Sequence, residues 1–334
     1  MEADVLNRTN LRRHTIVAGV FFIAVLSVQK VWADVPDYPD RSVNVVIPYP
    51  AGGSGDTTVR FIGRKLSERW GKPVIVENKA GASGIIGTQA VGKASPDGYT
   101  ALFTTTLHIQ NEAVGKKAPY NPITDFVPVG QVLRSPAVLV VSSAVSANSF
   151  GQYVDFVKSQ QSKPSFGSAG NATTSHLYGE LFTRKTGLTA VHVPYKGGAP
   201  MMTDLLGGHI NYAVIDVGSV MPMLKAGKVK VFAITGAERS SLLPNIPTFK
   251  ELGFTGFESY GWMGFLLPKN TPTSVTEKWE VALSAITKSP EYTELINGLG
   301  MEPTTIQAAQ FSSVLKSDIA NWRRIAEEAR ITAE

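Results

Sequence analysis

The chain has 334 residues, of which 43% are hydrophobic and 18% charged, an ordinary globular composition with enough length for one or two cores. It contains no cysteine, which excludes disulfides, thiolate catalysis and cysteine-ligated metals. The formal charge is +5, of which the first 33 residues contribute +2, and no basic run is present, so the charge pattern argues against a dedicated nucleic-acid binder.

Residues 1–33 have the features of an export signal. A basic start precedes an apolar run at 16–28, which is too short to span a bilayer comfortably, and Val31-Trp32-Ala33 resembles a cleavage site. We expect cleavage near Ala33 and a periplasmic mature protein that is not a lipoprotein, because no cysteine is available for lipid attachment. A membrane anchor is the alternative, and Arg12-Arg13 leaves Sec and twin-arginine export both open.

After this segment, apolar β-branched runs alternate with helical spacing, which favours an α/β architecture with mostly parallel sheets. In the first part of the chain, we expect strands at 41–47, 74–77 and 99–105 and helices at 57–70 and 85–94. In the second part, we expect strands at 137–142, 165–168, 190–193, 210–215 and 229–235, helices at 149–161, 175–186, 201–206 and 220–225, and a loop at 216–219. The chain then returns as an apolar strand within 260–272 and ends with helices at 274–288 and 308–329.

No low-complexity linker separates these two parts, so strands must connect them. The apolar segments "AVLVVS" (137–142) and "WMGFLLP" (262–268) are the candidates for two hinge strands. This arrangement predicts a discontinuous first domain, 34–135 plus 258–334, and a second domain, 136–257.

Four segments share one pattern, in which a strand is followed by small residues and then by the start of a helix. They lie at 50–56, 80–85, 168–176 and 195–200. The first turn of a helix has unpaired N–H groups at the positive end of its dipole, and glycine lets a ligand approach that backbone, so these loops suit a carboxylate or phosphate. The alternative for any single loop is ordinary turn chemistry, with Asp56 as a helix cap. His176, at the start of a helix, is a further candidate for ligand contact.

Other chemistries fail on spacing. Gly71-Lys72, Gly92-Lys93 and Gly115-Lys116 are followed by proline, alanine and lysine, where a nucleotide-binding P-loop needs serine or threonine. The Gly-x-Ser-x-Gly elbow of serine hydrolases is broken by Asp56 in one loop and by Ile85 in the other. The histidines form no close pair in sequence, which argues against zinc, and His192 is expected to pack within or at the edge of a strand. We therefore expect no catalytic residue, no metal and no cofactor.

The residues that follow the export signal resemble the Bug family, the extracytoplasmic receptors of tripartite tricarboxylate transporters, over essentially their whole length. The resemblance rests on the order and spacing of "YPDRSVNVVIPYPAGGSGDTTVR" (38–60), "GKPVIVENKAGASGIIGTQAV" (71–91), "APYNPITDFVPV" (118–129), "FGSAGNATTSHLYGELF" (166–182) and "VHVPYKGGAPMMTDLLGGHI" (191–210). It implies a type 2-like, two-domain periplasmic binding protein of the Venus-flytrap kind, which closes over a ligand without catalysis.

The resemblance also implies which residues hold the ligand, a small carboxylate such as a di- or tricarboxylate or an aromatic acid. The implied contacts of the first domain are Ala51, Gly52, Gly53, Ser54, Ala82, Ser83 and Gly84, with Thr105, Thr106 and His108 as ligand-specific additions. Those of the second domain are Ser168, Ala169, Gly170, Asn171 and Thr174, with Tyr195 and Asp216 facing the cleft. Two departures from the family pattern, Pro50-Ala51 before the glycines and "TTTLHIQNEAVGKKAPY" after the third strand, concern the ligand more than the fold.

The function expected from these features is solute binding, with delivery to the membrane permease of a tripartite tricarboxylate transporter. The receptor is expected to be a monomer and to bind no nucleic acid. An exported ligand sensor of a signalling system uses the same fold and is one alternative; an exported hydrolase is another and lacks a motif.

Overall fold

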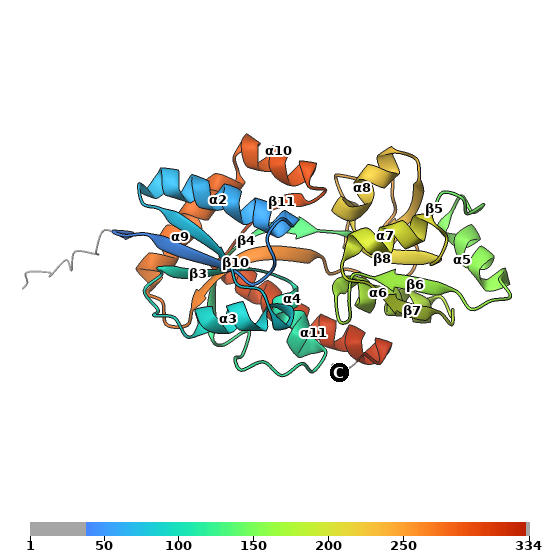
Figure 1. Ribbon diagram of the computed structural model, residues 1–334, viewed down its shortest axis with the longest axis horizontal. Helices are drawn as coiled ribbons and strands as arrows, with labels where there is room; N and C mark the ends of the chain where they lie inside the picture. The colour runs from blue at the N-terminus through green and yellow to red at the C-terminus, as the bar shows by residue number, and fades with distance from the viewer. Residues whose placement is uncertain (1–37, 332–334) are drawn as a thin grey trace, which may run out of the picture. The chain divides into compact units, whose positions relative to one another are not determined.

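The computed structural model describes residues 38–331, so the predicted export signal at 1–33 lies outside the described residues. The chain from Tyr38 onward forms one compact unit, which contains a six-stranded and a five-stranded sheet (Figure 1). Within the described part, no helix is both long and apolar enough to cross a bilayer.

The six-stranded sheet, called the first sheet, has the strand order β11-β4-β10-β3-β1-β2. Its strands are β1 (Val43–Ile47), β2 (Val74–Asn78), β3 (Thr100–Thr105), β4 (Phe126–Ser135), β10 (Gly261–Pro268) and β11 (Glu302–Gln307). The five-stranded second sheet has the order β7-β6-β8-β5-β9. Its strands are β5 (Ala137–Ser142), β6 (Ser165–Ser168), β7 (Val191–Pro194), β8 (Tyr212–Asp216) and β9 (Val229–Ile234).

The chain passes between the two sheets twice. The first passage is immediate, because β4 ends at Ser135 and β5 begins at Ala137. The second passage is the segment between β9 and β10. The two segments predicted as hinge strands are indeed strands, but neither crosses between the sheets, because β5 lies wholly in the second sheet and β10 wholly in the first.

The expectation of mostly parallel sheets is wrong. β1 runs parallel to β2 and β3, and β6 runs parallel to β7 and β8. However, β10 is antiparallel to β3 and β4, and β5 is antiparallel to β8 and β9. The reason is the double passage: the chain leaves the first sheet along β4 and returns along β10, so these neighbours must run in opposite directions.

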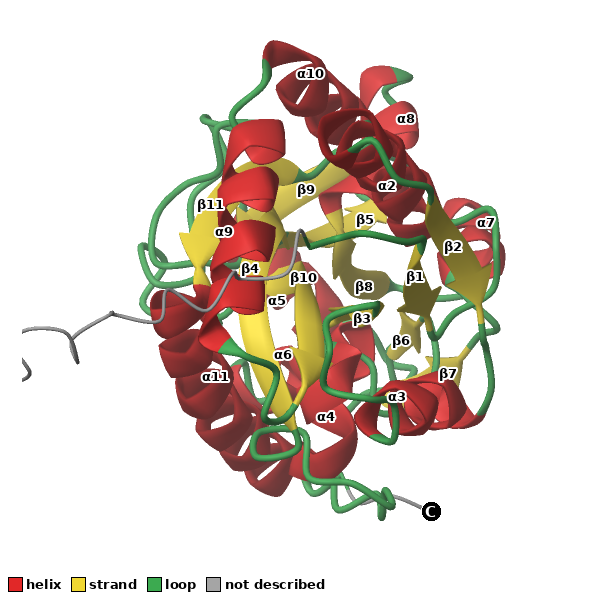
Figure 2. Ribbon diagram, turned by 90° about the vertical axis from the view of Figure 1, so that its left-hand side faces the viewer, coloured by secondary structure: helices red, strands yellow, loops and turns green. Residues whose placement is uncertain are grey.

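Helices cover both faces of each sheet (Figure 2). On the first sheet, one face packs against α2 (Ser54–Trp70), α9 (Thr273–Thr287) and α10 (Pro290–Gly298), and the other against α3 (Ile85–Gly92), α4 (Leu107–Ala113) and α11 (Ala308–Ala329). On the second sheet, one face packs against α5 (Phe150–Ser159) and α6 (Thr174–Lys185), and the other against α7 (Gly198–Leu206) and α8 (Val217–Lys225).

The alternation of side chains along the strands explains these layers. In β1, Val43, Val45 and Ile47 face the core under α2 and α9, whereas Val46 faces the opposite core. Both faces are buried, which is why the strand reads as a continuous apolar run. The core that contains Val46 also includes residues of α6 and α11 and continues beneath both sheets, so these helices tie the second sheet to the first.

Five elements were not predicted. They are the short 3₁₀ turn at Ala82–Gly84, α4, β4, α10 and β11. Pro128 and Gly130 interrupt the strand pattern of β4, and the register of its pairing with β10 shifts there. Pro303 is tolerated in β11 because this strand lies at the sheet edge. In addition, α8 begins at Val217, so most of the loop expected at 216–219 is helical.

Candidate functional site

A cavity of about 250 Å³, here called the hinge cavity, lies where the chain passes between the sheets. Both sheets and the starts of α4 and α6 contribute to its wall, so it is positioned by the ends of strands and helices, where ligands of α/β proteins bind. Its lining residues are Thr105, Thr106, Leu107, Gln110, Ser135, Ala137, Ala169, Thr173, Thr174, Ser175, Val214, Ile215, Asp216, Gly261, Trp262 and Met263.

The wall that comes from the first sheet is held in place by hydroxyl groups. The hydroxyl of Thr106 accepts a hydrogen bond of 2.7 Å from the backbone N–H of Trp262. The hydroxyl of Tyr49 lies 3.0 Å from that of Thr105 and 3.1 Å from that of Thr104. β3 and β10 are thereby fixed to each other at the cavity, and Tyr49 connects the cavity to the loop that follows β1.

The loop at 51–53 leads into α2 without a side-chain cap. Gly53 occupies the N-cap position and makes no side-chain hydrogen bond. Asp56 lies in the first turn of α2, where it accepts hydrogen bonds from the backbone N–H of Gly52 and from the side chains of Arg60 and Asn78. The hydrogen bond from Arg60 is the main reason that the pKa of Asp56 is lowered to about 2.

The prediction that Asp56 caps the helix is wrong, because Gly53 occupies the N-cap position. Asp56 instead reaches back from the first turn to fix the preceding loop. The first-turn N–H groups of α2 have no acceptor among the described residues, so they remain available to an anion. Gly55 belongs to this first turn, and a Cβ there would come within 3.6 Å of the sulfur of Met263, which lines the hinge cavity.

The loop at 82–84 has a strained backbone. Ala82 and Ser83 have φ angles of 47° and 56°, in the left-handed region that favours glycine, and Gly84 follows with 90°. The side chain of Asn111 donates to the carbonyl of Ser83 at 3.0 Å, and the ammonium of Lys116 donates to its hydroxyl at 2.9 Å. The loop is therefore held by α4 and the segment that follows it.

The loop at 168–176 is bonded mostly to itself. Ser168 is fully buried, and its hydroxyl contacts the carbonyl of Gly170 and the ring of His192. The backbone N–H of Ala169 donates to the hydroxyl of Ser175, and that of Ala172 donates to Nδ1 of His176. These bonds fix the loop around the first turn of α6, whose N–H groups have no acceptor within the described residues.

One side-chain hydrogen bond connects α4 to α6 across the cavity wall. Nε2 of Gln110 donates to the hydroxyl of Thr174 at 2.9 Å, and Gln110 is 1% exposed. The sequence interpretation missed Gln110, because α4 itself was not predicted. The spacing of Ile109 and Ala113, four residues apart, is the signal that could have revealed this helix.

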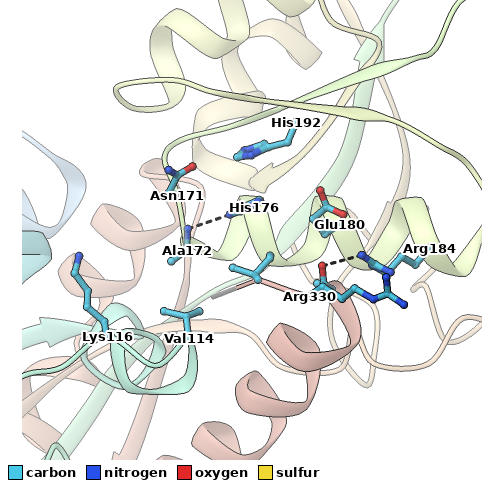
Figure 3. A pocket seen from close by; sticks show the side chains of 11 residues that line it. Val114, Lys116, Asn171, Ala172, His176, Glu180, Arg184, His192 and Arg330 are labelled. Carbon is cyan, nitrogen blue, oxygen red and sulfur yellow. Dashed lines mark hydrogen bonds between the residues drawn. The ribbon is translucent and has the colours of Figure 1, made fainter. Parts of the chain in front are cut away.

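A second cavity, here called the histidine chamber, has a volume of about 640 Å³ and is lined by residues of α6, β7 and the segments that follow α4 and α11 (Figure 3). His176 and His192 stack with ring centroids 3.8 Å apart. Burial lowers the pKa of both imidazoles to about 4, and the neighbouring ring adds to the effect for His176. The lining residues are Val114, Lys116, Asn171, Ala172, His176, Glu180, Arg184, His192, Ala329, Arg330 and Ile331.

The predicted site residues divide among these places. Thr105, Thr106, Ala169, Thr174 and Asp216 line the hinge cavity, and Asn171 and His176 line the histidine chamber. Ala51, Gly52, Gly53, Ser54, Ala82 and Ser83 are exposed in the flanking loops, whereas Gly84 and Ser168 are buried and Gly170 is partly buried.

Two of the predicted side chains point elsewhere. His108 is buried, and its Nε2 lies 3.0 Å from the carbonyl of Pro122, while burial lowers its pKa to about 4. The hydroxyl of Tyr195 donates to Asp204 at 2.6 Å. The structure therefore brings neither side chain to the hinge cavity.

Among residues 38–331, no group of three or more histidine, aspartate or glutamate side chains has the geometry to hold a metal ion. The side chains that line the hinge cavity are hydroxyl, amide and apolar groups, with Asp216 as the single charged one. Both oxygens of Asp216 accept hydrogen bonds from Ser219, one from its N–H and one from its hydroxyl. The arrangement suits binding of a small polar solute and provides no activated nucleophile.

Comparisons with known proteins agree with this description. A family model described as "Tripartite tricarboxylate transporter family receptor" matches residues 58–331. A UPF0065 protein encoded in the tcbD-tcbE intergenic region of a Pseudomonas species is 32% identical over 97% of this chain and 96% of its own. Protein BugT of Bordetella pertussis is 30% identical over 96% of this chain and 98% of its own.

Solved structures are similar over most of the chain. The periplasmic binding protein BugD is 32% identical, with a TM-score of 0.75 over 89% of this chain and 100% of its own. Rpa4515 of R. palustris, solved with adipate, is 31% identical, with a TM-score of 0.77 over 88% and 99%. MatC of Rhodopseudomonas palustris, solved with malate, is 27% identical, with a TM-score of 0.73 over 86% and 99%.

Proposed function

Because the chain belongs to the tripartite tricarboxylate transporter family of receptors, we propose that it captures a small carboxylate in the hinge cavity and delivers it to a membrane permease of that transporter type. The receptors of this family are periplasmic solute-binding proteins and not enzymes, which confirms the expected receptor fold and excludes the hydrolase alternative. The adipate and malate found in two similar structures support a carboxylate as the ligand.

The observation that carries the proposal is the uncharged wall of the hinge cavity on the side of α4 and α6. Thr105, Thr106, Gln110 and Thr174 present hydroxyl and amide groups there, beside the first turn of α6. A hydrogen bond to a charged group contributes about 1.5–3 kcal/mol, and micromolar affinity needs about 8 kcal/mol. About three to six such bonds are therefore sufficient, and no lysine or arginine is required.

The carboxylate of Asp216 gives the ligand a direction. Asp216 would repel a ligand carboxylate placed beside it, so the ligand's carboxylate lies toward α6. A hydrogen-bond donor of the ligand, such as a hydroxyl or ammonium group, lies toward Asp216. Hydroxy acids and amino acids therefore belong in any screen, together with plain and aromatic acids.

Three further parts of the proposal concern the whole protein. The export signal is cleaved near Ala33, and the mature receptor is a monomer without a lipid anchor. The two sheets are the cores of two domains, 34–135 with 258–334 and 136–257, which close on the ligand about the two passages of the chain. The permease recognises the closed form.

The test is a thermal-shift screen of the mature chain against mono-, di- and tricarboxylates, followed by calorimetric titration of the hits. A ligand at 100 times its dissociation constant adds about 2.7 kcal/mol to the free energy of unfolding, so the melting temperature should rise clearly. A shift with sugars or cations and none with any carboxylate would contradict the proposal.

A further inference from the structure

The hinge cavity and the histidine chamber are lined by neighbouring residues of the same two segments. Thr173 and Thr174 of the loop and first turn of α6 face the hinge cavity, whereas Asn171 and Ala172 of the same loop face the chamber. On the other wall, Gln110 faces the hinge cavity, and Val114 and Lys116 face the chamber. Both side chains of the Gln110–Thr174 hydrogen bond line the hinge cavity, and each belongs to a segment whose neighbouring residues line the chamber.

The two spaces differ in charge. No lysine, arginine or histidine lines the hinge cavity, whereas Lys116, Arg184 and Arg330 line the chamber with Glu180 as its single acid. Figure 3 shows Lys116 near Asn171 at one end of the chamber and Arg184 beside Arg330 at the other. The ammonium of Lys116 uses one of its three donors on Ser83, so two remain for a ligand.

The stacked histidines do not make the chamber a metal site. Their ring planes are 9° apart and their centroids 3.8 Å apart, so the in-plane lone pairs of the two rings lie in nearly parallel, separated planes and do not converge on one ion. In addition, Nδ1 of His176 accepts the N–H of Ala172, and Nε2 of His192 contacts Ser168. The rings instead form a flat, neutral part of the chamber wall, which Lys116, Arg184 and Arg330 also line.

The volumes set the size of ligand that each space accommodates. Sites for small organic ligands usually measure about 300–1,000 Å³. The hinge cavity, at about 250 Å³, is small for such a ligand, and the chamber, at about 640 Å³, falls within the range. A ligand longer than the hinge cavity therefore has a polar, positively charged space to enter next to it.

We propose that the histidine chamber is the distal subsite of the ligand site and that it holds the second acidic group of an elongated dianion, such as a long α,ω-dicarboxylate. One carboxylate of the ligand lies in the hinge cavity, the ligand's hydrocarbon chain passes the Gln110–Thr174 contact, and its second carboxylate binds Lys116. This inference rests on the proposed function and deepens it, because it gives the receptor a preference for ligand length.

The test compares succinate and sebacate by calorimetric titration of the mature chain. Wild type binds sebacate more tightly than succinate. Lys116→Met weakens sebacate binding about tenfold relative to succinate binding, as expected for the loss of one charge-assisted hydrogen bond. Lys117→Met is the matched control, because it removes the same charge from the next residue, which is exposed and does not line the chamber, and it leaves the ratio within twofold.

A second variant tests whether Lys116→Met acts only by moving the loop at 82–84, because Lys116 also donates a hydrogen bond to the hydroxyl of Ser83. Asn171→Asp keeps the shape of an exposed side chain and places a negative charge in the chamber, so it should also weaken sebacate binding relative to succinate binding. An unchanged ratio in both variants overturns the distal subsite while leaving the proposed function intact. Failure of every carboxylate to bind wild type overturns both proposals.

Discussion

The imidazole rings of His176 and His192 lie face to face, 3.8 Å apart, although the two residues are in different secondary-structure elements, α6 and β7. Burial keeps both rings neutral by lowering the pKa of each from 6.5 to about 4. Glu180 and Arg184 of α6, Lys116 after α4 and Arg330 after α11 are the charged groups that share the chamber with the pair.

This stack predicts a loss of stability in mild acid. The unfolded chain takes up protons on these histidines near pH 6.5, but the folded chain does so only near pH 4, so the free energy of unfolding falls as the pH drops from about 6.5 to about 4. We expect the pair to account for a loss of about 1–2 kcal/mol, after a discount for the solvent that reaches both rings.

Urea unfolding at pH 7.0 and pH 4.5 checks this expectation. His192→Phe keeps a flat ring but cannot titrate, so its stability should change less with pH than that of wild type. Asp318 serves as an internal reference of opposite sign. Burial raises its pKa to about 6, so its contribution to the free energy of unfolding decreases as the pH rises. An equal pH dependence in wild type and His192→Phe would show that the pair does not act in this way.

Glu302 of β11 predicts a second, larger effect on stability. It is 5% exposed, its Oε2 lies 3.0 Å from Nη2 of Arg134, and its Oε1 accepts from the hydroxyl of Ser240 and the N–H of Ser241. Glu302→Gln removes the counter-charge of Arg134, which is 40% exposed, and weakens the hydrogen bonds that the buried carboxylate accepts, which is costly because Glu302 itself is buried. We expect a loss of about 2–4 kcal/mol, measured by urea unfolding.

Glu68→Gln is the control for this prediction. Glu68 pairs with Arg64 at 4.0 Å on the surface, where both side chains are more than half exposed, so its loss should change stability by less than about 0.5 kcal/mol. Similar effects of Glu302→Gln and Glu68→Gln would mean that the connection from β11 to Ser240 contributes little to holding the second passage of the chain.

Most helices and strands could be predicted from the sequence because their hydrophobic periodicity is clear. α11 has the predicted bounds, and β6 matches residue for residue. Periodicity failed where proline and glycine interrupt a strand, as at Pro128 and Gly130 in β4. Strand direction was also wrong, because it depends on how the chain passes between the sheets and not on local spacing.

The candidate site was only partly readable. Loops after strands were expected to face a cleft, and residues of the third strand and of the loop at 168–176 do line the hinge cavity. The sequence indicated no close histidine pair, because His176 and His192 are adjacent only in space. Gln110 was missed since a buried glutamine in a short helix has no distinctive pattern, and its partner Thr174 lies 64 residues away.

Gly300 predicts a packing effect that can be separated from backbone strain. Its φ angle is 71°, and a Cβ there would lie 2.4 Å from the Cα of Gly218, just before the start of β11. Gly227 has a similar φ angle of 67° but open space around it. Gly227→Ala should therefore cost about 1 kcal/mol for the left-handed backbone alone, whereas Gly300→Ala should cost at least about 2 kcal/mol more.

Urea unfolding of the two alanine variants, with wild type as reference, measures the difference. Because Gly218 follows Asp216 at the start of α8, we also expect Gly300→Ala to weaken ligand binding at the hinge cavity. Equal destabilisation in the two variants would show that the backbone contact between Gly218 and Gly300 relaxes without cost.

Gly53 allows a direct test of whether the loop at 51–54 belongs to the ligand site. A Cβ at this position meets no atom within 4 Å, and the residue has the extended backbone of an N-cap, with a φ angle of −83°. Aspartate and asparagine are both favoured N-caps, so Gly53→Asp and Gly53→Asn should fold with a stability within about 1 kcal/mol of wild type.

Only the aspartate places a negative charge against the unpaired N–H groups of α2, so it should abolish carboxylate binding while the asparagine variant retains most of it. Calorimetric titration with the strongest carboxylate found in the screen decides the matter: full affinity in Gly53→Asp would place the loop outside the site.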